Sequence, residues 1–256
     1  MAIARPPDSA LILFEDEAIV VIDKPAGLLV HAEADAGSVL AMMRQREEER
    51  GLDPEALHLV HRLDRETSGV LILGRGADVT KTLGAAFRDR KVHKRYLALT
   101  HPVPAVRWAE VDHMLAAKRI QGGERMVVVE RGGVQASSEV EVLARGRRYG
   151  LVRVLPDQGR KHQVRVALAE MGAPIIGDFL YGGARVARMA PRMMLHARGL
   201  ELAHPTQPDR HLSLKAPLPA DFLDLFADDG GLIPSDLDRR HRKAPPKPRP
   251  KPRRRR

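Results

Sequence analysis

The sequence predicts an α+β fold with a mixed, mostly antiparallel sheet and flanking helices. Its strand-like apolar segments come in clusters and do not alternate strictly with helices, which argues against the parallel sheets of Rossmann and TIM-barrel folds. Neither a GxGxxG nor a GxxxxGK[ST] motif is present, so nothing indicates a dinucleotide or a nucleoside triphosphate. With 256 residues, 43% of them hydrophobic, the chain is long enough to bury a sizeable core.

Runs of β-branched residues predict the strands, and apolar residues at helical spacing predict the helices. The predicted strands are Ala18–Asp23, Gly69–Leu73, Lys94–Thr100, Met126–Glu130, Ser138–Leu143 and Tyr149–Leu155. The predicted helices are Ser38–Glu49, Asp78–Arg88, Lys161–Met171 and Pro219–Phe226. We expect Ser38 and Asp78 to cap the first two helices, and Gly172 to end the third.

The composition excludes several classes of protein. The chain has no cysteine, so disulfides, thiolate zinc sites, iron–sulfur clusters and a cysteine nucleophile are ruled out. No apolar run approaches the roughly 20 residues that a membrane helix needs, and the N-terminal MAIARPPDSA lacks the apolar centre of a signal peptide. We therefore expect a cytoplasmic protein without a membrane partner.

The net charge of +10 is concentrated at the C-terminus. The last 18 residues, Arg239–Arg256, hold eight arginines, three lysines, five prolines and no acid, so the rest of the chain is nearly neutral. Prolines among repelling cations predict an extended, disordered arm. Such an arm can bind RNA phosphates in a salt-dependent way, although it can also be a solubilising appendage without a partner.

Five ionisable side chains gather in six residues of the segment HRLDRETSG, residues 61–69, just before the apolar run Val70–Leu73. A loop that enters a core strand is a rigid platform and can aim the carboxylate of Asp64 into a cleft. The alternative is an ordinary surface turn in which Asp64 binds local backbone amides. His58, His61 and Asp64 also form an HxxHxxD pattern, but no convincing helix frames it and no fourth ligand is evident, so a metal site is disfavoured.

A second segment, QGRKHQVRV at residues 158–166, places basic side chains in the first turn of a predicted helix, where the helix dipole is already positive. Unfavourable placements of charge such as this one occur most often at functional sites, and a helix N-terminus readily binds anions. Val164, Leu168 and Met171 recur at helical spacing and should face the core. Arg165 lies beside them and needs a carboxylate partner, for which Asp64 is the obvious candidate.

Tyr96 is one of three tyrosines and lies in a predicted strand within KRYLA, residues 94–98. A lone tyrosine in a strand is usually a core residue with its hydroxyl at the sheet edge.

Together these segments resemble the motifs of the RluA-type pseudouridine synthases. HRLDRETSG is similar to the family's HRLDxxTSG box, and five further boxes follow the family's order. These are KPAGLLVH (24–31), KRYLA (94–98), GRKHQVRV (159–166), IIGDFLYG (175–182) and MMLHA (193–197). The match covers about Phe14 to Phe226, and six boxes in order are far more specific than any one of them.

The resemblance implies the pseudouridine synthase fold, with a central active-site cleft, and an isomerase that converts uridine to pseudouridine in structured RNA without a cofactor or a metal. It implies an N-terminal extension over residues 1–13, a catalytic domain over 14–227, and a linker with the basic tail over 228–256. The chain has too few residues ahead of the KPAGLLVH box for an S4 RNA-binding domain, so it looks like the compact RluA branch. We expect a monomer.

The resemblance also implies residue roles. Asp64 matches the nucleophile that attacks the ribose or the base, and Arg165 matches the arginine that pairs with it. Tyr96 matches the tyrosine that packs against the base and helps to remove the C5 proton. Arg62 matches a residue that enters the RNA stack. RNA contacts are predicted for His61, Arg62, Arg160, Lys161 and His162. Lys161 and Ala167 depart from the family pattern, which usually has Ser or Thr and His there.

The compact branch acts on a 23S rRNA loop and on a tRNA anticodon-loop uridine, so both are expected substrates; a tRNA-only or an rRNA-only synthase is the alternative. Another possibility is a non-catalytic RNA-binding or ribosome-assembly factor, but binding alone requires none of Asp64, Tyr96 and Arg165. A hydrolase that uses Asp64 and Glu66 is disfavoured, because alternate residues of a strand point to opposite faces.

Overall fold

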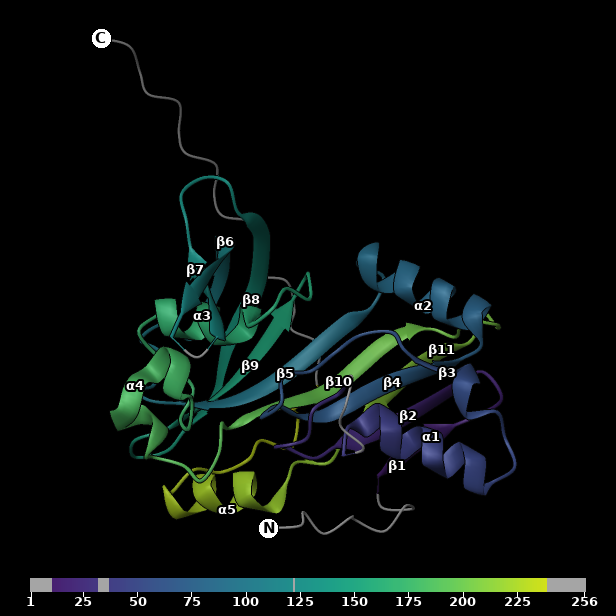
Figure 1. Ribbon diagram of the computed structural model, residues 1–256. Helices are drawn as coiled ribbons and strands as arrows, with labels where there is room; N and C mark the ends of the chain where they lie inside the picture. Colours follow the sequence, from purple (N-terminus) through teal and green to yellow (C-terminus); the bar gives the residue numbers. More distant parts are fainter. Residues whose placement is uncertain (1–10, 32–36, 122, 239–256) are drawn as a thin grey trace.

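The computed structural model describes residues 11–31, 37–121 and 123–238. Over these residues the chain forms one 11-stranded sheet in the order β1-β2-β4-β10-β5-β9-β8-β6-β7, with β11 paired to β10 and β3 paired to β4 (Figure 1). The pair β4–β10 is parallel and the other described pairs are antiparallel. The predicted α+β class with a mixed, mostly antiparallel sheet is confirmed.

The elements have the following bounds. The strands are β1 Ile12–Glu15, β2 Ile19–Lys24, β3 Leu57–Leu59, β4 Ser68–Arg75, β5 His93–Thr100, β6 Trp108–Ile120, β7 Gly123–Val128, β8 Val134–Arg145, β9 Gly150–Pro156, β10 Leu195–Ala203 and β11 His211–Lys215. The helices are α1 Val39–Glu49, the 3-10 turn η2 Pro54–Ala56, α2 Ala77–Arg88, α3 Gln163–Glu170, α4 Phe179–Ala187 and α5 Ala220–Asp228. No helix of the described ranges combines the length and the apolar character needed to cross a membrane.

Every predicted strand and helix has a counterpart, but the sequence missed several elements. The long strand β6 has mostly exposed or half-buried residues, so it lacks a clear apolar face. Helix α4 contains the consecutive glycines Gly182 and Gly183, which lower its helix propensity, and Gly183 at φ +70° interrupts the helix. The short strands β1 and β3 and the pair β10–β11 were missed as well.

The caps show which local predictions hold. Ser38 caps α1, where its hydroxyl accepts the N–H of Ala41 at 3.3 Å, and Gly172 follows α3 at φ +71°. Asp78 does not cap α2: the N-cap is Gly76, and Asp78 lies within the first turn.

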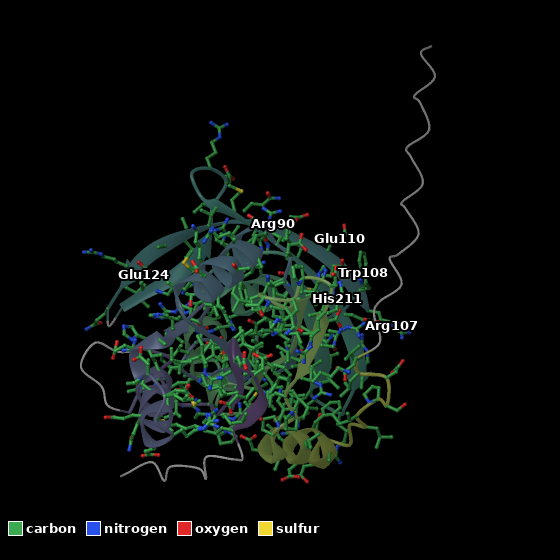
Figure 2. All side chains as sticks on the ribbon, turned by 90° about the vertical axis from the view of Figure 1, so that its right-hand side faces the viewer. Arg90, Arg107, Trp108, Glu110, Glu124 and His211 are labelled. Carbon is green, nitrogen blue, oxygen red and sulfur yellow. The ribbon has the colours of Figure 1, made fainter. Side chains whose placement is uncertain are left out.

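The core consists of layers on both faces of the sheet, and Figure 2 shows how closely side chains fill the space between the ribbons. Strands β2 and β4 are apolar on both faces, with one set of alternate residues packed with α1 and the other set packed with α2. A third cluster joins β5, β8 and β9 to α3 and to α5, where Phe222 and Phe226 are fully buried. Val164 and Leu168 lie in this cluster and Met171 packs against it, as the helical spacing predicts.

The parallel contact between β4 and β10 lies at the centre of the sheet and fixes the start of β4. Ser68 is paired with His196, and the Ser68 hydroxyl lies 2.9 Å from His196 Nδ1. Gly69 has φ +110°, and a Cβ there would meet the carbonyl oxygen of Ala197 at 2.3 Å. Only glycine allows so close an approach, so the segment that precedes Ser68 is held firmly against β10.

We expect Gly69→Ala to lower the free energy of unfolding by at least about 3 kcal/mol, because the new methyl group collides with backbone that cannot move alone. Gly132 is the matched control, since it has φ +75° and nothing within 4 Å of an added Cβ. Gly132→Ala should cost only about 1 kcal/mol of conformational strain. Urea unfolding of both variants measures the difference, and equal losses would show that the contact with Ala197 does not hold the strand.

Candidate active site

A cleft of about 1040 Å³ opens beside β5, the loop before β4 and the N-terminal end of α3. It is lined by all eight residues singled out in the sequence: Asp64, Tyr96, Arg165, His61, Arg62, Arg160, Lys161 and His162. The fold thus gathers residues that lie up to about a hundred positions apart in the chain. Their roles stay predictions.

Asp64 lies in the loop between β3 and β4, which is held by a hydrogen bond within the loop and by hydrogen bonds from the end of β2 and the segment after it. The loop turns where the Thr67 N–H donates to the Asp64 carbonyl at 3.0 Å. The carbonyl of Arg65 accepts from the Gly27 N–H at 2.9 Å and from Lys24 Nζ at 3.0 Å. The carboxylate is therefore carried by a backbone that its own turn and the segment Lys24–Gly27 hold in place.

Lys24 was not assigned a role from the sequence, although its side chain is fully buried. Besides Arg65, its ammonium donates to the carbonyls of Pro25 at 2.8 Å and Leu28 at 2.9 Å. Burial lowers the pKa of Lys24 to about 8, while the negative charges of Glu66 and Asp64 oppose that shift. In the sequence, the signal for a buried lysine is its place at the end of the apolar strand in AIVVIDK, residues 18–24.

The guanidinium of Arg165, on α3, lies between two carboxylates. Its Nη1 is 3.1 Å from Asp64 Oδ2, while Nε and Nη2 lie 2.7 and 2.9 Å from the two oxygens of Asp178. Burial acts to lower the pKa of Arg165, but hydrogen bonds and charge from Asp178, and then from Asp64, raise it overall. The predicted pair of Asp64 and Arg165 is thus present in the structure, and Asp178 adds a second, two-pronged contact.

Asp178 performs two tasks that the sequence did not reveal. It caps α4 by accepting the N–H groups of Leu180 at 3.0 Å and Tyr181 at 3.2 Å, and it holds Arg165. Its side chain is only 1% exposed, against 26% for Asp64. An aspartate at the start of an apolar helix indicates a cap, but its contact with Arg165 depends on tertiary structure.

His162 immediately precedes α3 and has a left-handed backbone, with φ +57°. Its Nδ1 lies 2.8 Å from the hydroxyl of Tyr181, and its Nε2 lies 3.8 Å from Asp64 Oδ2. Burial lowers the pKa of His162 to about 4 and outweighs the opposing charge of Asp64. The ring of Tyr181 also lies 5.0 Å below the guanidinium of Arg165, so Tyr181 supports both residues.

Tyr96 reaches the cleft from β5 and packs against two of the core clusters. Burial raises the pKa of its phenol, and the charge of Asp64 raises that pKa further. At neutral pH the side chain is therefore an uncharged ring with a hydroxyl group.

His61 is engaged within the protein. Its Nε2 accepts the Ile72 N–H at 3.1 Å, and its ring stacks on Phe87 at 4.6 Å. Burial, and then the charge of Lys94, lower the pKa of His61 to about 3. Because the backbone amide uses Nε2, this nitrogen is not free to bind a metal, and no potential metal cluster of three or more His, Asp or Glu occurs in the described ranges.

The predicted RNA-binding cations differ in their surroundings. Arg62 is exposed and has no hydrogen bond or ion pair to the described part of the chain. Arg160 donates from Nε to the Gln135 carbonyl at 3.3 Å, and Lys161 pairs with Glu124 at 2.8 Å. Glu124 lies at the outer edge of the molecule in Figure 2. Helix α3 begins only at Gln163, so the expectation that Arg160 and Lys161 lie in its first turn is wrong.

Asp64 and Glu66 are not alternate residues of a strand, so the argument from opposite strand faces was wrong. Both belong to the turn before β4, and both line the cleft. Their environments differ, because Asp64 faces Arg165 whereas Glu66 is 49% exposed and lies 3.9 Å from Arg65.

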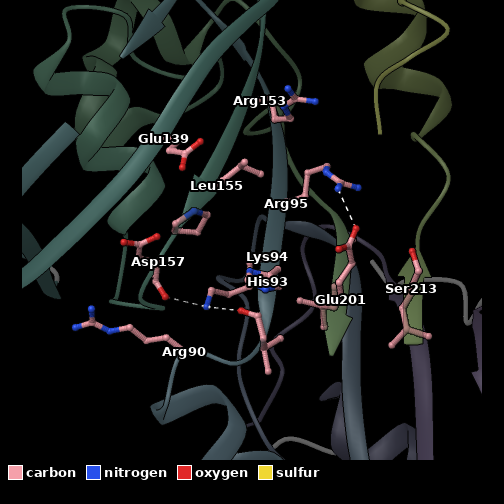
Figure 3. Close-up of a pocket in the computed structure, with 15 residues that line it drawn as sticks. Arg90, His93, Lys94, Arg95, Glu139, Arg153, Leu155, Asp157, Glu201 and Ser213 are labelled. Atoms are coloured by element: carbon pink, nitrogen blue, oxygen red, sulfur yellow. Dashed lines mark hydrogen bonds and ion pairs between the residues drawn. The ribbon is translucent and has the colours of Figure 1, made fainter. Parts of the chain in front are cut away.

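A smaller pocket of about 330 Å³ adjoins the cleft where β5 and β9 separate, and the two share Arg90, Lys94 and Pro156 (Figure 3). Lys94 Nζ donates to the carbonyls of Val92 at 3.2 Å and Asp157 at 3.4 Å. In the same pocket, Arg95 Nη2 lies 3.1 Å from Glu201 Oε1.

Comparison with known proteins connects this geometry to a family. The family described as RNA pseudouridylate synthase matches residues 18–170. Ribosomal large subunit pseudouridine synthase D of Pseudomonas aeruginosa is 36% identical over 230 residues, which covers 84% of this chain and 70% of the relative. tRNA pseudouridine synthase C of Yersinia pestis is 34% identical over 212 residues, covering 76% and 81%.

Among solved structures, human RNA pseudouridylate synthase domain containing 4 is similar, with a TM-score of 0.71, 31% identity, and coverage of 88% of this chain and 95% of that one. The family pattern covers more than half of the chain, and the alignments cover 70% and 81% of the two bacterial relatives. The chain therefore belongs to the RluA-type RNA pseudouridylate synthase family and is a pseudouridine synthase, an isomerase.

Proposed function

We propose that this synthase isomerises uridine in RNA stem-loops, of both 23S rRNA and the tRNA anticodon loop, with Asp64 as its nucleophile. The observation that carries the proposal is the carboxylate of Asp64, which lines a cleft of about 1040 Å³ while Arg165 holds it at 3.1 Å. Relatives named for the large ribosomal subunit and for tRNA support the two substrate classes alike.

The reaction first needs an accessible base. A stacked uridine cannot present C1′ or C5 to a side chain, so it must leave the stack at a cost of a few kcal/mol. Arg62 is exposed at the cleft, and its planar guanidinium can stack on the bases that the uridine leaves behind. The cleft then encloses the detached uracil and keeps water from the ribose.

In the chemical step, Asp64 attacks C1′ or the base, the N1–C1′ bond breaks, and the uracil turns. A C1′–C5 bond then forms and the bond to Asp64 breaks, which releases the carboxylate. The proton on C5 leaves and N1 gains one, so the product is an isomer and needs no redox partner. Arg165 Nη1 lies 3.1 Å from Asp64 Oδ2 and orients the carboxylate for the attack. The raised pKa of Tyr96 keeps its phenol neutral, which suits a ring that packs against the base.

Asp64→Asn should abolish pseudouridine formation, with a loss of more than about a thousandfold, because an amide is a poor nucleophile. RNA affinity should change by less than about threefold, since the binding cations remain. Glu66→Gln is the matched control and should keep its activity. Single-turnover pseudouridine assays and RNA titrations measure both quantities.

Two outcomes would contradict this assignment. Equal loss of binding and activity in Asp64→Asn would favour a binding factor. If the wild type released free uracil or cleaved the RNA, and neither Asp64→Asn nor Glu66→Gln did so, the protein would be a hydrolase that uses both carboxylates.

Asp178→Asn should slow the chemical step by roughly 10–100-fold, because Arg165 loses its fixed orientation against Asp64. Asp221→Asn is the control, since Asp221 holds Arg192 through a similar two-pronged contact at 2.6 and 2.7 Å outside the cleft. Single-turnover rates at saturating RNA, with unfolding curves for each variant, separate positioning from stability. Similar rates for the two variants would refute a positioning role for Asp178.

The basic tail, residues 239–256, lies outside the described residues, and its RNA contact is part of the proposal. Deleting it should weaken RNA binding and make the plot of log Kd against log salt less steep, because fewer counterions are released. The rate at saturating RNA should stay unchanged. A truncated protein with the full salt slope would show that the tail does not contact phosphates.

A further inference from the structure

Phe179 is unlike the other phenylalanines of this chain. It is 70% exposed, whereas Phe222 and Phe226 are fully buried, and Phe14 and Phe87 pack against a core cluster. A single exposed apolar side chain is ordinary on a protein surface, and Leu232 is another, at 83% exposure. Exposure alone therefore assigns no role to Phe179.

The position of Phe179 distinguishes it from Leu232. Phe179 lines the cleft that holds Asp64, and Leu232 does not. It is the first residue of α4 and directly follows Asp178, whose carboxylate caps this helix and holds Arg165. The backbone of Phe179 is therefore fixed relative to Arg165 while its ring remains open to solvent.

The charge of the cleft indicates what that ring can contact. The cleft is lined by eight lysine and arginine residues but only three acids, and the acids Asp64 and Asp178 are both paired with Arg165. The remaining cations, among them the exposed Arg62 and Arg90, suit the phosphates of a single strand. An exposed aromatic ring in the same cleft as such cations is the arrangement that proteins use to stack on unpaired bases.

We propose that Phe179 is a stacking platform for an unpaired base next to the uridine that enters the cleft. The inference rests on the proposed function in that RNA occupies this cleft, and it adds a contact for a second nucleotide. Every base presents an aromatic face, so the contact adds affinity and fixes the position of the strand in the cleft, but it discriminates little between base sequences.

The test uses the full chain and a stem-loop RNA identified by pseudouridine mapping. Phe179→Ala should raise the Kd about tenfold, Phe179→Trp should keep the wild-type Kd, and the control Leu232→Ala should not change it. The slope of log Kd against log salt should be the same in all four proteins, because stacking releases no counterions.

A double-mutant cycle identifies the base. Removing the base at the stacked position, to leave an abasic nucleotide, should weaken wild-type binding about tenfold and leave Phe179→Ala unaffected. Scanning abasic positions on both sides of the target finds that nucleotide, and 2-aminopurine there should be quenched by wild type and not by Phe179→Ala.

Three results would overturn the inference. The first is an unchanged Kd for Phe179→Ala, and the second is that the losses of affinity from Phe179→Ala and from the abasic nucleotide add at every position. The third is a change of oligomeric mass in Phe179→Ala, which would assign the ring to a contact between protein chains. Melting curves establish that the variants are folded. Pseudouridine formation by the wild type is scored separately, so failure of the proposed function is distinguishable from failure of stacking.

Discussion

The guanidinium of Arg165 supplies the positive charge that two carboxylates share, and the site is arranged around it. A partly buried arginine and two aspartates are costly to remove from water unless each has a partner in good geometry. Here Arg165 joins α3, the cap of α4 and the loop before β4 through three short hydrogen bonds. One cation thus determines where three distant segments meet.

Arg165 can reach Asp64 only because the loop that bears Asp64 is held in place independently of Arg165. Backbone contacts at two points of this loop hold it. The buried ammonium of Lys24 and the backbone N–H of Gly27 hold the loop at Arg65, and the close contact of Gly69 with Ala197 fixes the point where the loop becomes β4. The site therefore depends on backbone contacts as much as on its charged side chains.

Sequence reasoning predicted the fold class, the pairing of Asp64 with Arg165 and eight of the residues that line the cleft, because unusual charge clusters and the family motifs lie in contiguous segments. It could not find the second partner of Arg165, since Asp178 looks like a helix cap and nothing local indicates its contact with Arg165. It also wrongly placed Asp64 and Glu66 on a strand, because a short charged segment before a strand has no periodicity that distinguishes a turn from a strand. His61 was predicted to bind RNA, although the backbone amide of Ile72 already uses one ring nitrogen.

The unequal exposure of the two aspartates suits the proposed role of Asp64 as the nucleophile. Asp178 is buried and holds Arg165 through two oxygens, whereas Asp64 offers one oxygen to Arg165 and is 26% exposed. If Asp64 leaves Arg165 to form a bond with the substrate, the guanidinium keeps its contacts with Asp178 and the ring of Tyr181. No buried charge is left without a partner, so the departure of Asp64 avoids the large penalty of breaking an isolated buried pair. In the proposed reaction, the same contacts keep Arg165 in place to receive the carboxylate when Asp64 is released.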